Sequence, residues 1–205
     1  MAKTIVLDIE TVPRPGIMDT WYPQWAGGKY PDKEGEELER MAALHAEFGM
    51  VCAVAFAPAY SKEEPTVHTA TGIKEEEVLL LDLSEALDGG ATLVGHNIKG
   101  FDIPFLAKRY LAHFGKVPTP LNVAGMKPWE IKHRDTMEYM RFGGDASMSL
   151  RSACLLLGIG DPKEGCCGSD VYDLFRAGDM ARIGEYCVGD VVAERELFMK
   201  LDRLG

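Results

Sequence analysis

The order of patterns along the chain predicts an α/β fold in which helices cover a mixed sheet. Runs of β-forming residues come first, at 3–10, 50–58 and 66–72. Helix and strand then alternate through 74–115, and the last third reads as mainly helical. This order is typical of a mixed sheet with helices packed on it. With 205 residues, no internal repeat and no polar linker, we expect one domain spanning 1–205.

Composition narrows the class of protein. A hydrophobic fraction of 46% excludes a disordered chain. No stretch approaches the ~20 apolar residues of a membrane span, and the first residues lack the basic-then-apolar order of a signal peptide. We therefore expect a cytoplasmic protein with no membrane partner. The net charge of -10 argues against strong non-specific nucleic-acid binding. Metal ions bound in an acidic cleft would, however, make the local charge of that cleft positive.

The five cysteines do not form a zinc pattern or a disulfide framework, because they are odd in number and lack C-x-x-C spacing. Reduced thiols are the expectation. A redox pair of Cys166 and Cys167 is the less favoured alternative.

The first half of the chain reads as strands interrupted by one long insertion. Residues 3–10 contain the buried run "IVL". The stretch 13–34 is rich in proline, glycine and aromatic residues and predicts a surface loop close to the site that Asp8 and Glu10 serve. Residues 35–48 predict a short amphipathic helix before the strand at 50–58.

The second half predicts helices around two more strands. "KEEEVLLLDLSEALDGG" (74–90) predicts a helix with acids in its first turn, a Gly-Gly stop and a solvated acidic face. A strand at 91–97 precedes a helix at 102–115, which Asp and Pro introduce. After a proline-rich loop at 116–128, residues 130–140 predict a last strand. Three further helices are predicted, at 149–157, 169–177 and 179–203.

Asp8 and Glu10 follow the first buried run, and as residues i and i+2 of a strand they point to the same face. Two carboxylates this close repel each other unless a cation lies between them. Taken alone, the pair also fits an ordinary turn at a strand end.

Two other segments carry candidate residues. "GHNIKGFDIPFL" places Asn97, Phe101 and Asp102 in a loop from a buried strand into a helix, and Tyr186 and Asp190 share one face of the last helix. Each has a simpler interpretation. Asp102 suits a helix N-cap, Phe101 the core and Asn97 a turn, while the Tyr–Asp pair is ordinary on a helix.

The combination of D-x-E, N-x3-F-D and Y-x3-D fits one chemistry. Two Mg²⁺ or Mn²⁺ ions ~3.5–4 Å apart need a cage of hard anionic oxygens. The candidate ligands are Asp8, Glu10, Asp102 and Asp190. One ion would activate a water as the nucleophile, and the Tyr186 hydroxyl would orient that water.

The three segments resemble the Exo I, Exo II and Exo III motifs of the DEDD superfamily of 3'-5' exonucleases. "LDIET" corresponds to Exo I, "GHNIKGFD" to Exo II and "YCVGD" to Exo III. The chain is similar over residues 4 to about 203 to the proofreading exonuclease domain of family B DNA polymerases and to its stand-alone forms. Tyr186 stands at the tyrosine-branch position, whereas the histidine-branch position holds Glu185.

The resemblance implies a ribonuclease H-like fold with a five-stranded mixed sheet flanked by helices. It also implies a two-metal 3'-5' exonuclease that removes nucleoside 5'-monophosphates from the 3' end of single-stranded or frayed DNA. Thr11, Asn97 and Phe101 would hold the terminal nucleotide, and any polymerase or repair protein would act as a partner in trans. The catalytic residues would be Asp8, Glu10, Asp102, Tyr186 and Asp190.

Several alternatives stay open. The same carboxylates serve a 3'-5' exoribonuclease, and a non-catalytic nucleic-acid-binding module is the rival from another class. Gly184 and Gly189 either make the last helix irregular or leave room for substrate, since each costs ~1 kcal/mol relative to alanine. Asp135 is expected to be scaffold rather than a group that supports the metals, and His96 to be structural.

Overall fold

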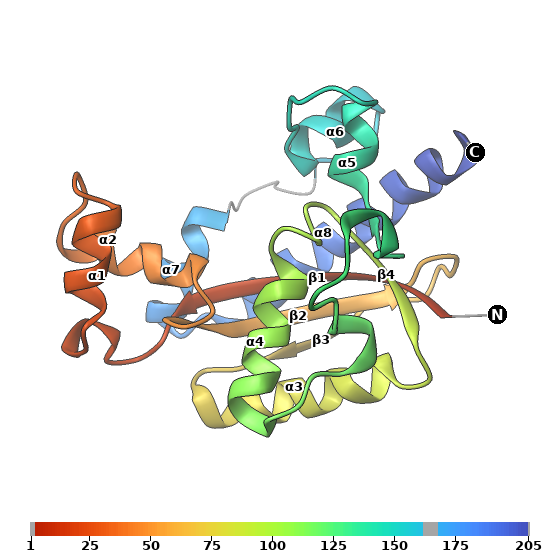
Figure 1. Cartoon of the computed structure of the whole chain (residues 1–205). Coiled ribbons are helices and arrows are strands. Elements are labelled where there is room, and N and C mark those ends of the chain that lie inside the picture. Colours follow the sequence, from red (N-terminus) through yellow and green to blue (C-terminus); the bar gives the residue numbers. More distant parts are fainter. Residues whose placement is uncertain (1–2, 162–167, 205) are drawn as a thin grey trace.

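The protein is built around a five-stranded sheet with strand order β3-β2-β1-β4-β5 (Figure 1). The computed structural model describes residues 3–161 and 168–204. The central strand β1 (Lys3–Pro13) is antiparallel to β2 (Gly49–Pro58) and parallel to β4 (Ala91–Gly95). The outer strands β3 (Thr66–Thr69) and β5 (Arg134–Asp135) pair antiparallel with β2 and parallel with β4. The predicted five-stranded mixed sheet is confirmed and is consistent with a ribonuclease H-like fold.

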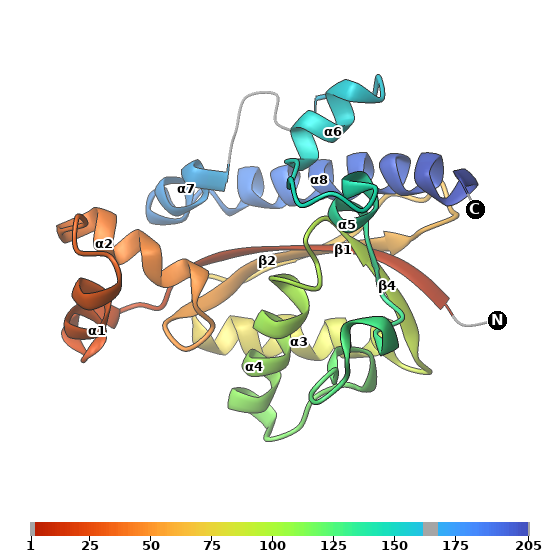
Figure 2. The same ribbon diagram turned by 45° about the horizontal axis from the view of Figure 1, so that its top comes forward.

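Helices cover both faces of the sheet. The long helix α8 (Met180–Leu201) lies along one face, and α3 (Ile73–Leu87) and α4 (Asp102–Phe114) lie on the other (Figure 2). Because both faces are covered, the central strands bury consecutive residues, as β1 does from Ile5 to Leu7. This packing fixes which side chains of β1 meet α8.

Three short helices contact α8. They are α5 (Thr136–Arg141), α6 (Leu150–Leu156) and α7 (Val171–Ala177), and α6 lies above α8 in Figure 2. The helices predicted at 149–157, 169–177 and 179–203 are confirmed as α6, α7 and α8, whereas α5 forms where the last strand was expected to continue. Among the described residues, no helix has the length and hydropathy needed to cross a membrane.

The prediction of a surface loop at 13–34 is wrong in part. This stretch contains a 3₁₀ turn and the helix α1 (Tyr22–Lys29), which packs against α2 (Gly35–Met41) beyond the end of the sheet (Figure 1). Tyr22 is fully buried, and its hydroxyl donates a 2.6 Å hydrogen bond to the carbonyl of Leu38. The segment thus has a small core of its own, made of Ile17, Tyr22, Ala26, Leu38, Ala42 and Phe48.

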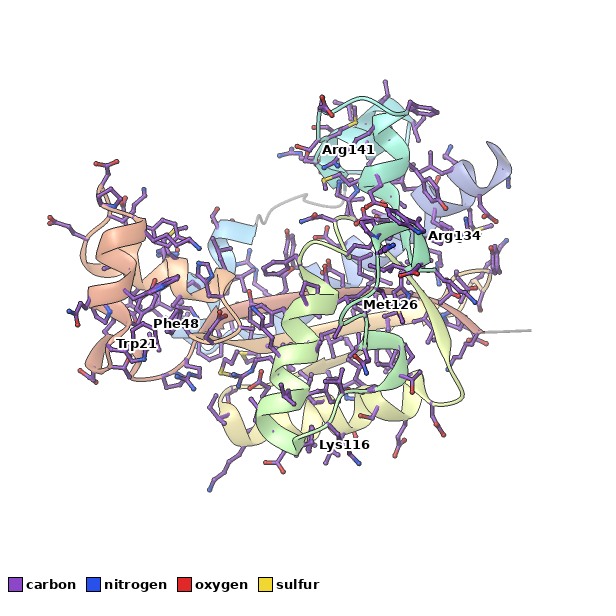
Figure 3. The ribbon with its side chains drawn as sticks, viewed as in Figure 1. Trp21, Phe48, Lys116, Met126, Arg134 and Arg141 are labelled. Carbon is purple, nitrogen blue, oxygen red and sulfur yellow. The ribbon has the colours of Figure 1, made fainter. Side chains whose placement is uncertain are left out.

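Aromatic rings close this small core. The ring centroids of Trp21 and Phe48 lie 5.3 Å apart in an edge-to-face arrangement, and both residues are labelled in Figure 3. The helix predicted at 35–48 is shorter than expected. It ends at Met41 and continues only as a 3₁₀ turn, Ala42–Leu44.

The strand predicted at 130–140 is reduced to Arg134–Asp135. The Asp135 side chain accepts hydrogen bonds from the backbone amides of Met137 and Glu138, and so caps α5 at the point where the strand was expected to continue. An N-cap ends the strand because the first amides of a helix need an acceptor.

The acidic helix α3 is not solvated along its whole acidic side, contrary to expectation. Glu76 is fully buried and accepts hydrogen bonds from Nε and Nη2 of Arg109 at 2.8 and 2.5 Å. It also accepts from the backbone amide of Val51 at 2.8 Å, which ties α3 to β2. The sequence of α3 alone could not reveal that Arg109 of α4 is buried against Glu76.

Three of the five cysteines, Cys52, Cys154 and Cys187, are buried free thiols, as expected. Cys166 and Cys167 lie outside the described residues.

Candidate active site

Two carboxylates of β1 point toward α8. Asp8 and Glu10 lie on the same side of the strand, and both are half-buried. They pair across the sheet with Ala55 and Ala53 of β2, whose small side chains leave space around them. The pairing between β1 and β2 shifts register immediately after Glu10, so the strand is irregular at the site and then continues to Pro13.

The helix α8 supplies the opposite wall. Tyr186 and Asp190 lie one turn apart on its buried face, each with 6% of its surface exposed. Cys187 lies between them in the helix. Its sulfur is 3.5 Å from the carbonyl oxygen of Asp8 and 3.5 Å from Oδ2 of Asp8. This thiol contact holds α8 against β1 at the level of the carboxylates.

The third segment reaches the site at the start of α4. Asp102 is 5% exposed, and its Oδ1 accepts a 3.2 Å hydrogen bond from the backbone amide of Ile9. The N-cap of α4 is Phe101, so the interpretation of Asp102 as a simple cap is wrong. Its carboxylate instead faces the strand that carries Asp8 and Glu10.

The carboxylates are close enough to share a cation. Oxygens of Asp8, Glu10 and Asp190 all lie within 4.8 Å of one another. Burial raises the pKa of Asp8 well above its usual value, and the neighbouring charges of Glu10, Asp102 and Asp190 raise it further. Burial also raises the pKa of Asp102 to about 8.

This donor set fits a divalent metal ion. Hard carboxylate oxygens that converge from β1, α4 and α8 are the ligands that Mg²⁺ and Mn²⁺ prefer. Without a cation, the charges of Glu10, Asp102 and Asp190 add to burial in raising the pKa of Asp8, because like charges repel one another. A bound cation would remove that repulsion.

Tyr186 keeps its proton in this setting. Burial raises the pKa of its phenol, and the charges of Asp190 and Glu10 add to the effect. The hydroxyl lies toward the 3₁₀ turn Gly168–Asp170, since a Cβ at Gly168 would stand 3.8 Å from it. A neutral phenol beside the carboxylates can donate a hydrogen bond to a water or to a phosphoryl oxygen.

Two of the three expected substrate residues line a cavity next to Glu10. Thr11 and Phe101 border a volume of about 680 Å³ that opens between α2 on one side and α7 on the other. The Thr11 hydroxyl donates to the carbonyl of Ala43 at 2.8 Å, so it helps to shape the wall of this cavity. Leu44, which is 51% exposed, also lines this cavity.

Asn97 does not line this cavity. It adopts a left-handed conformation with φ of 63°, and its backbone amide donates to Asp135 Oδ1 at 2.9 Å. A Cβ at Gly100 would lie 2.5 Å from the Asn97 side-chain oxygen, so a larger residue there would displace the Asn97 side chain. Asn97 therefore forms the turn that leads into Asp102.

Asp135 holds this turn in place. It is 3% exposed and accepts a second backbone hydrogen bond, of 3.1 Å, from Lys99. The geometry agrees with the scaffold interpretation. His96 bonds the Thr136 hydroxyl at 3.0 Å and the Met148 carbonyl at 2.6 Å, which agrees with a structural role.

Sequence reasoning missed Glu194. It lies one turn after Asp190 on α8, is 2% exposed, and has a pKa raised to about 8 by burial and by the charges of Asp135, Asp102 and Asp190. The Thr136 hydroxyl lies near it, yet neither Glu194 oxygen makes a hydrogen bond of ordinary geometry within the described part of the chain. The available signal was the i, i+4, i+8 spacing of Tyr186, Asp190 and Glu194.

The glycines of α8 do not interrupt it. The helix is continuous from Met180 to Leu201. A Cβ at Gly184 would meet methyl groups of Thr69 and Val67 at 3.5 and 3.6 Å, so Gly184 faces β3 and not the carboxylates. The alternative of an irregular helix is wrong, whereas room for substrate stays a prediction.

Part of the chain matches the model of a known protein family. Residues 43–204 match a family described as a predicted 3'-5' exonuclease related to the exonuclease domain of PolB. The matched part contains Asp102, Tyr186 and Asp190, whereas Asp8 and Glu10 precede it and join the site through the fold. No curated protein matches the chain.

Proposed function

We propose, from the premise that this chain belongs to the family of predicted 3'-5' exonucleases related to the exonuclease domain of PolB, that it is a tyrosine-branch, two-metal exonuclease. Its substrate would be the 3' end of single-stranded or frayed DNA, and its product nucleoside 5'-monophosphates. The observation that carries this proposal is the convergence of Asp8, Glu10 and Asp190 within 4.8 Å, beside the buried Asp102.

The carboxylates divide the metal sites between them. Asp8, Glu10 and Asp190 would hold one ion, and Asp102, whose charge acts on Asp8, would help Asp8 to hold the second. Bound Mg²⁺ or Mn²⁺ would supply Lewis-acid stabilisation of the phosphoryl oxygens and a water of lowered pKa.

The remaining residues position the reactants. The protonated phenol of Tyr186 would donate to the attacking water and orient it toward the phosphorus. Thr11 and Phe101 would border the terminal nucleoside in the cavity next to Glu10, where an aromatic ring accepts any base. Asn97 would act indirectly, through the turn that leads into Asp102.

The polymer is proposed to be DNA, and residues 1–205 to act as one exonuclease unit. Contact with a polymerase or a repair protein would be made in trans. RNA is the alternative polymer, because these carboxylates contact phosphate and not the 2'-hydroxyl by which RNA is distinguished.

The test is digestion of a 5'-labelled single-stranded DNA oligonucleotide with Mg²⁺, Mn²⁺ or EDTA. The Asp8→Ala/Glu10→Ala variant is compared with Glu75→Ala/Glu77→Ala, which removes the same charge from exposed positions of α3 on the other face of the sheet. We expect a metal-dependent ladder that shortens from the 3' end in wild type and control and is absent from the site variant. Cleavage of an RNA oligonucleotide alone would reassign the polymer, and cleavage of neither would refute the proposal.

A further inference from the structure

A second hollow lies on the α8 side of the sheet, away from the carboxylates. It has a volume of about 720 Å³ and is bordered by the N-terminal part of β1, the segment 128–134, α5 and the end of α8. Its buried floor includes Phe198, which is 1% exposed. We call it the Trp129–Arg134 hollow. Its volume falls within the ~300–1,000 Å³ of ordinary ligand pockets.

Cations dominate its rim. The charged residues that line the hollow are Lys99, Lys132 and Arg134 against the single carboxylate of Glu138. Lys99 pairs with Glu138 at 2.6 Å, whereas Lys132 and Arg134 are exposed and make no ion pair with any described residue. Asp202, which accepts a 2.9 Å hydrogen bond from the Tyr60 hydroxyl, also acts on Arg134, so three cations face two carboxylates. In a chain of net charge -10, this remaining excess of positive charge suits an anion.

Exposed aromatic rings stand among these cations. Trp129 is 77% exposed, Tyr60 63% and Tyr139 37%. The Tyr139 hydroxyl accepts a 2.5 Å hydrogen bond from Nη1 of Arg134, and Lys127 lies 5.3 Å from the centre of the Trp129 ring. Flat rings interleaved with cations suit a polymer that has both stacked bases and phosphates.

The hollow lies at a defined distance from the carboxylates. Its lining residue Thr4 precedes Asp8 by four positions of one strand, which corresponds to ~13 Å. Phe198 follows Asp190 by eight positions of one helix, which corresponds to ~12 Å. Lys99 also lines the hollow and lies in the turn between Asn97 and Asp102. A few nucleotides of single strand span this distance.

We propose that the Trp129–Arg134 hollow binds the nucleotides upstream of the 3' end of a single-stranded nucleic acid. Lys132 and Arg134 would contact its phosphates, and a base would stack on Trp129. This inference rests on the proposed function, since it extends the substrate from the carboxylates back along the strand. A binding site of this kind would allow a protein of negative net charge to hold a polyanion, because the cations that contact the phosphates lie together in the hollow.

The test compares a long and a short substrate. Wild type, Lys132→Ala/Arg134→Ala and Trp129→Ala are assayed for binding of a 5'-fluorescein dT12 by anisotropy with Ca²⁺ at several salt concentrations, and for Mn²⁺-dependent hydrolysis of dT12 and of the dinucleotide dTpdT. The control is Lys74→Ala/Lys116→Ala, which also removes two exposed cations. In Figure 3, Lys116 is labelled at the lower edge of the molecule, well below Arg134.

We expect the double variant to bind dT12 about tenfold more weakly than wild type. The slope of the logarithm of the binding constant against the logarithm of the salt concentration should be smaller in magnitude by about 1.4, because each phosphate contact on a single strand contributes about 0.7. Trp129→Ala should weaken binding without changing that slope. Hydrolysis of dTpdT should stay at the wild-type rate in both variants and in the control.

The outcomes separate this inference from the proposed function. If wild type hydrolyses dT12 and both variants bind it as tightly as wild type, the proposed role of the hollow is refuted and the proposed exonuclease activity is not. Weakened binding in the variants with no hydrolysis of either substrate by wild type would support the hollow and refute the exonuclease. Equal weakening in the Lys74→Ala/Lys116→Ala control would also overturn the hollow, because the effect would then follow net charge alone.

Discussion

The backbone amide of Ile9 donates a 3.2 Å hydrogen bond to Oδ1 of Asp102, and this contact joins β1 to the start of α4 across 93 positions of the chain. It brings the second carboxylate segment to the first. The Asp102 side chain therefore has two tasks, as an acceptor for a buried amide and as a charge beside Asp8.

Substitution of Asp102 separates these two tasks. Asp102→Asn keeps an oxygen for the Ile9 amide and removes the charge, so nuclease activity should fall by at least about a hundredfold. At pH 4, where the raised pKa keeps the Asp102 carboxyl protonated in the fold, the free energy of unfolding should stay close to wild type. Asp102→Ala should lose activity and also about 1–3 kcal/mol of stability, because the buried amide loses its partner. Urea unfolding and oligonucleotide digestion measure the two effects. Equal destabilisation by both substitutions would contradict the role of the hydrogen bond.

Tyr186→Phe tests the phenol. The ring should remain packed on α8, because only the hydroxyl is removed from a side chain that is 6% exposed. Hydrolysis should slow by about a hundredfold, since a positioned hydrogen-bond donor is worth that much, while the Kd for a single-stranded oligonucleotide changes little. Equal losses of rate and of affinity would show that the hydroxyl holds the polymer and not the water.

Metal binding should stabilise the protein more at high pH than at low pH. Asp102 has its pKa raised from 3.8 to about 8, so between about pH 4 and pH 8 the folded metal-free protein binds more protons than the unfolded chain. The free energy of unfolding therefore falls as pH rises through that window. Because Mn²⁺ displaces those protons, its effect on Tm should be larger at pH 8 than at pH 5.5.

Differential scanning fluorimetry measures this effect, with Asp8→Ala/Glu10→Ala as the control that should lose most of it. An equal rise of Tm at both pH values, or in wild type and control, would mean that the ion binds elsewhere.

Glu194→Gln should stabilise the metal-free protein in a pH-dependent way. The pKa of Glu194 is raised from 4.5 to about 8 by burial and by neighbouring carboxylates, so at pH 9 the folded state contains an unfavourable buried charge that glutamine lacks. At pH 5 the carboxyl is protonated and the two side chains are nearly equivalent. Urea unfolding at both pH values measures the difference. Glu196→Gln on the exposed side of α8 should show none, and a gain that is the same at both pH values would refute the electrostatic cause.

Gly184→Ala should stabilise α8. The added methyl group would make ordinary contacts with Thr69 and Val67, and alanine is favoured over glycine inside a helix by ~1 kcal/mol. Nuclease activity should not change, since the position faces β3. Loss of activity with the fold intact would support the interpretation of this glycine as room for substrate.

The sequence predicted most of the regular structure because short-range periodicity determines it. Because side chains alternate between the two faces of a strand, Asp8 and Glu10 share one face of β1. Because residues four apart lie about one helical turn apart, Tyr186 and Asp190 share one face of α8. The order of strands and helices then indicated a mixed sheet. At 13–34 the prediction failed because a small tertiary core folds the expected loop, and at 130–140 it failed because the local Asp135 cap begins α5 and shortens the last strand.

The sequence by itself determined which residues share a face of their own strand or helix, because that depends only on the repeat of the backbone. Only the tertiary structure decided which faces meet. It brought Asp102 to Ile9, buried Glu76 against Arg109, and placed Glu194 without a hydrogen bond of ordinary geometry beside the carboxylates. These contacts join residues far apart in the chain, and the cost of burying a charge is set by the partner that packing supplies.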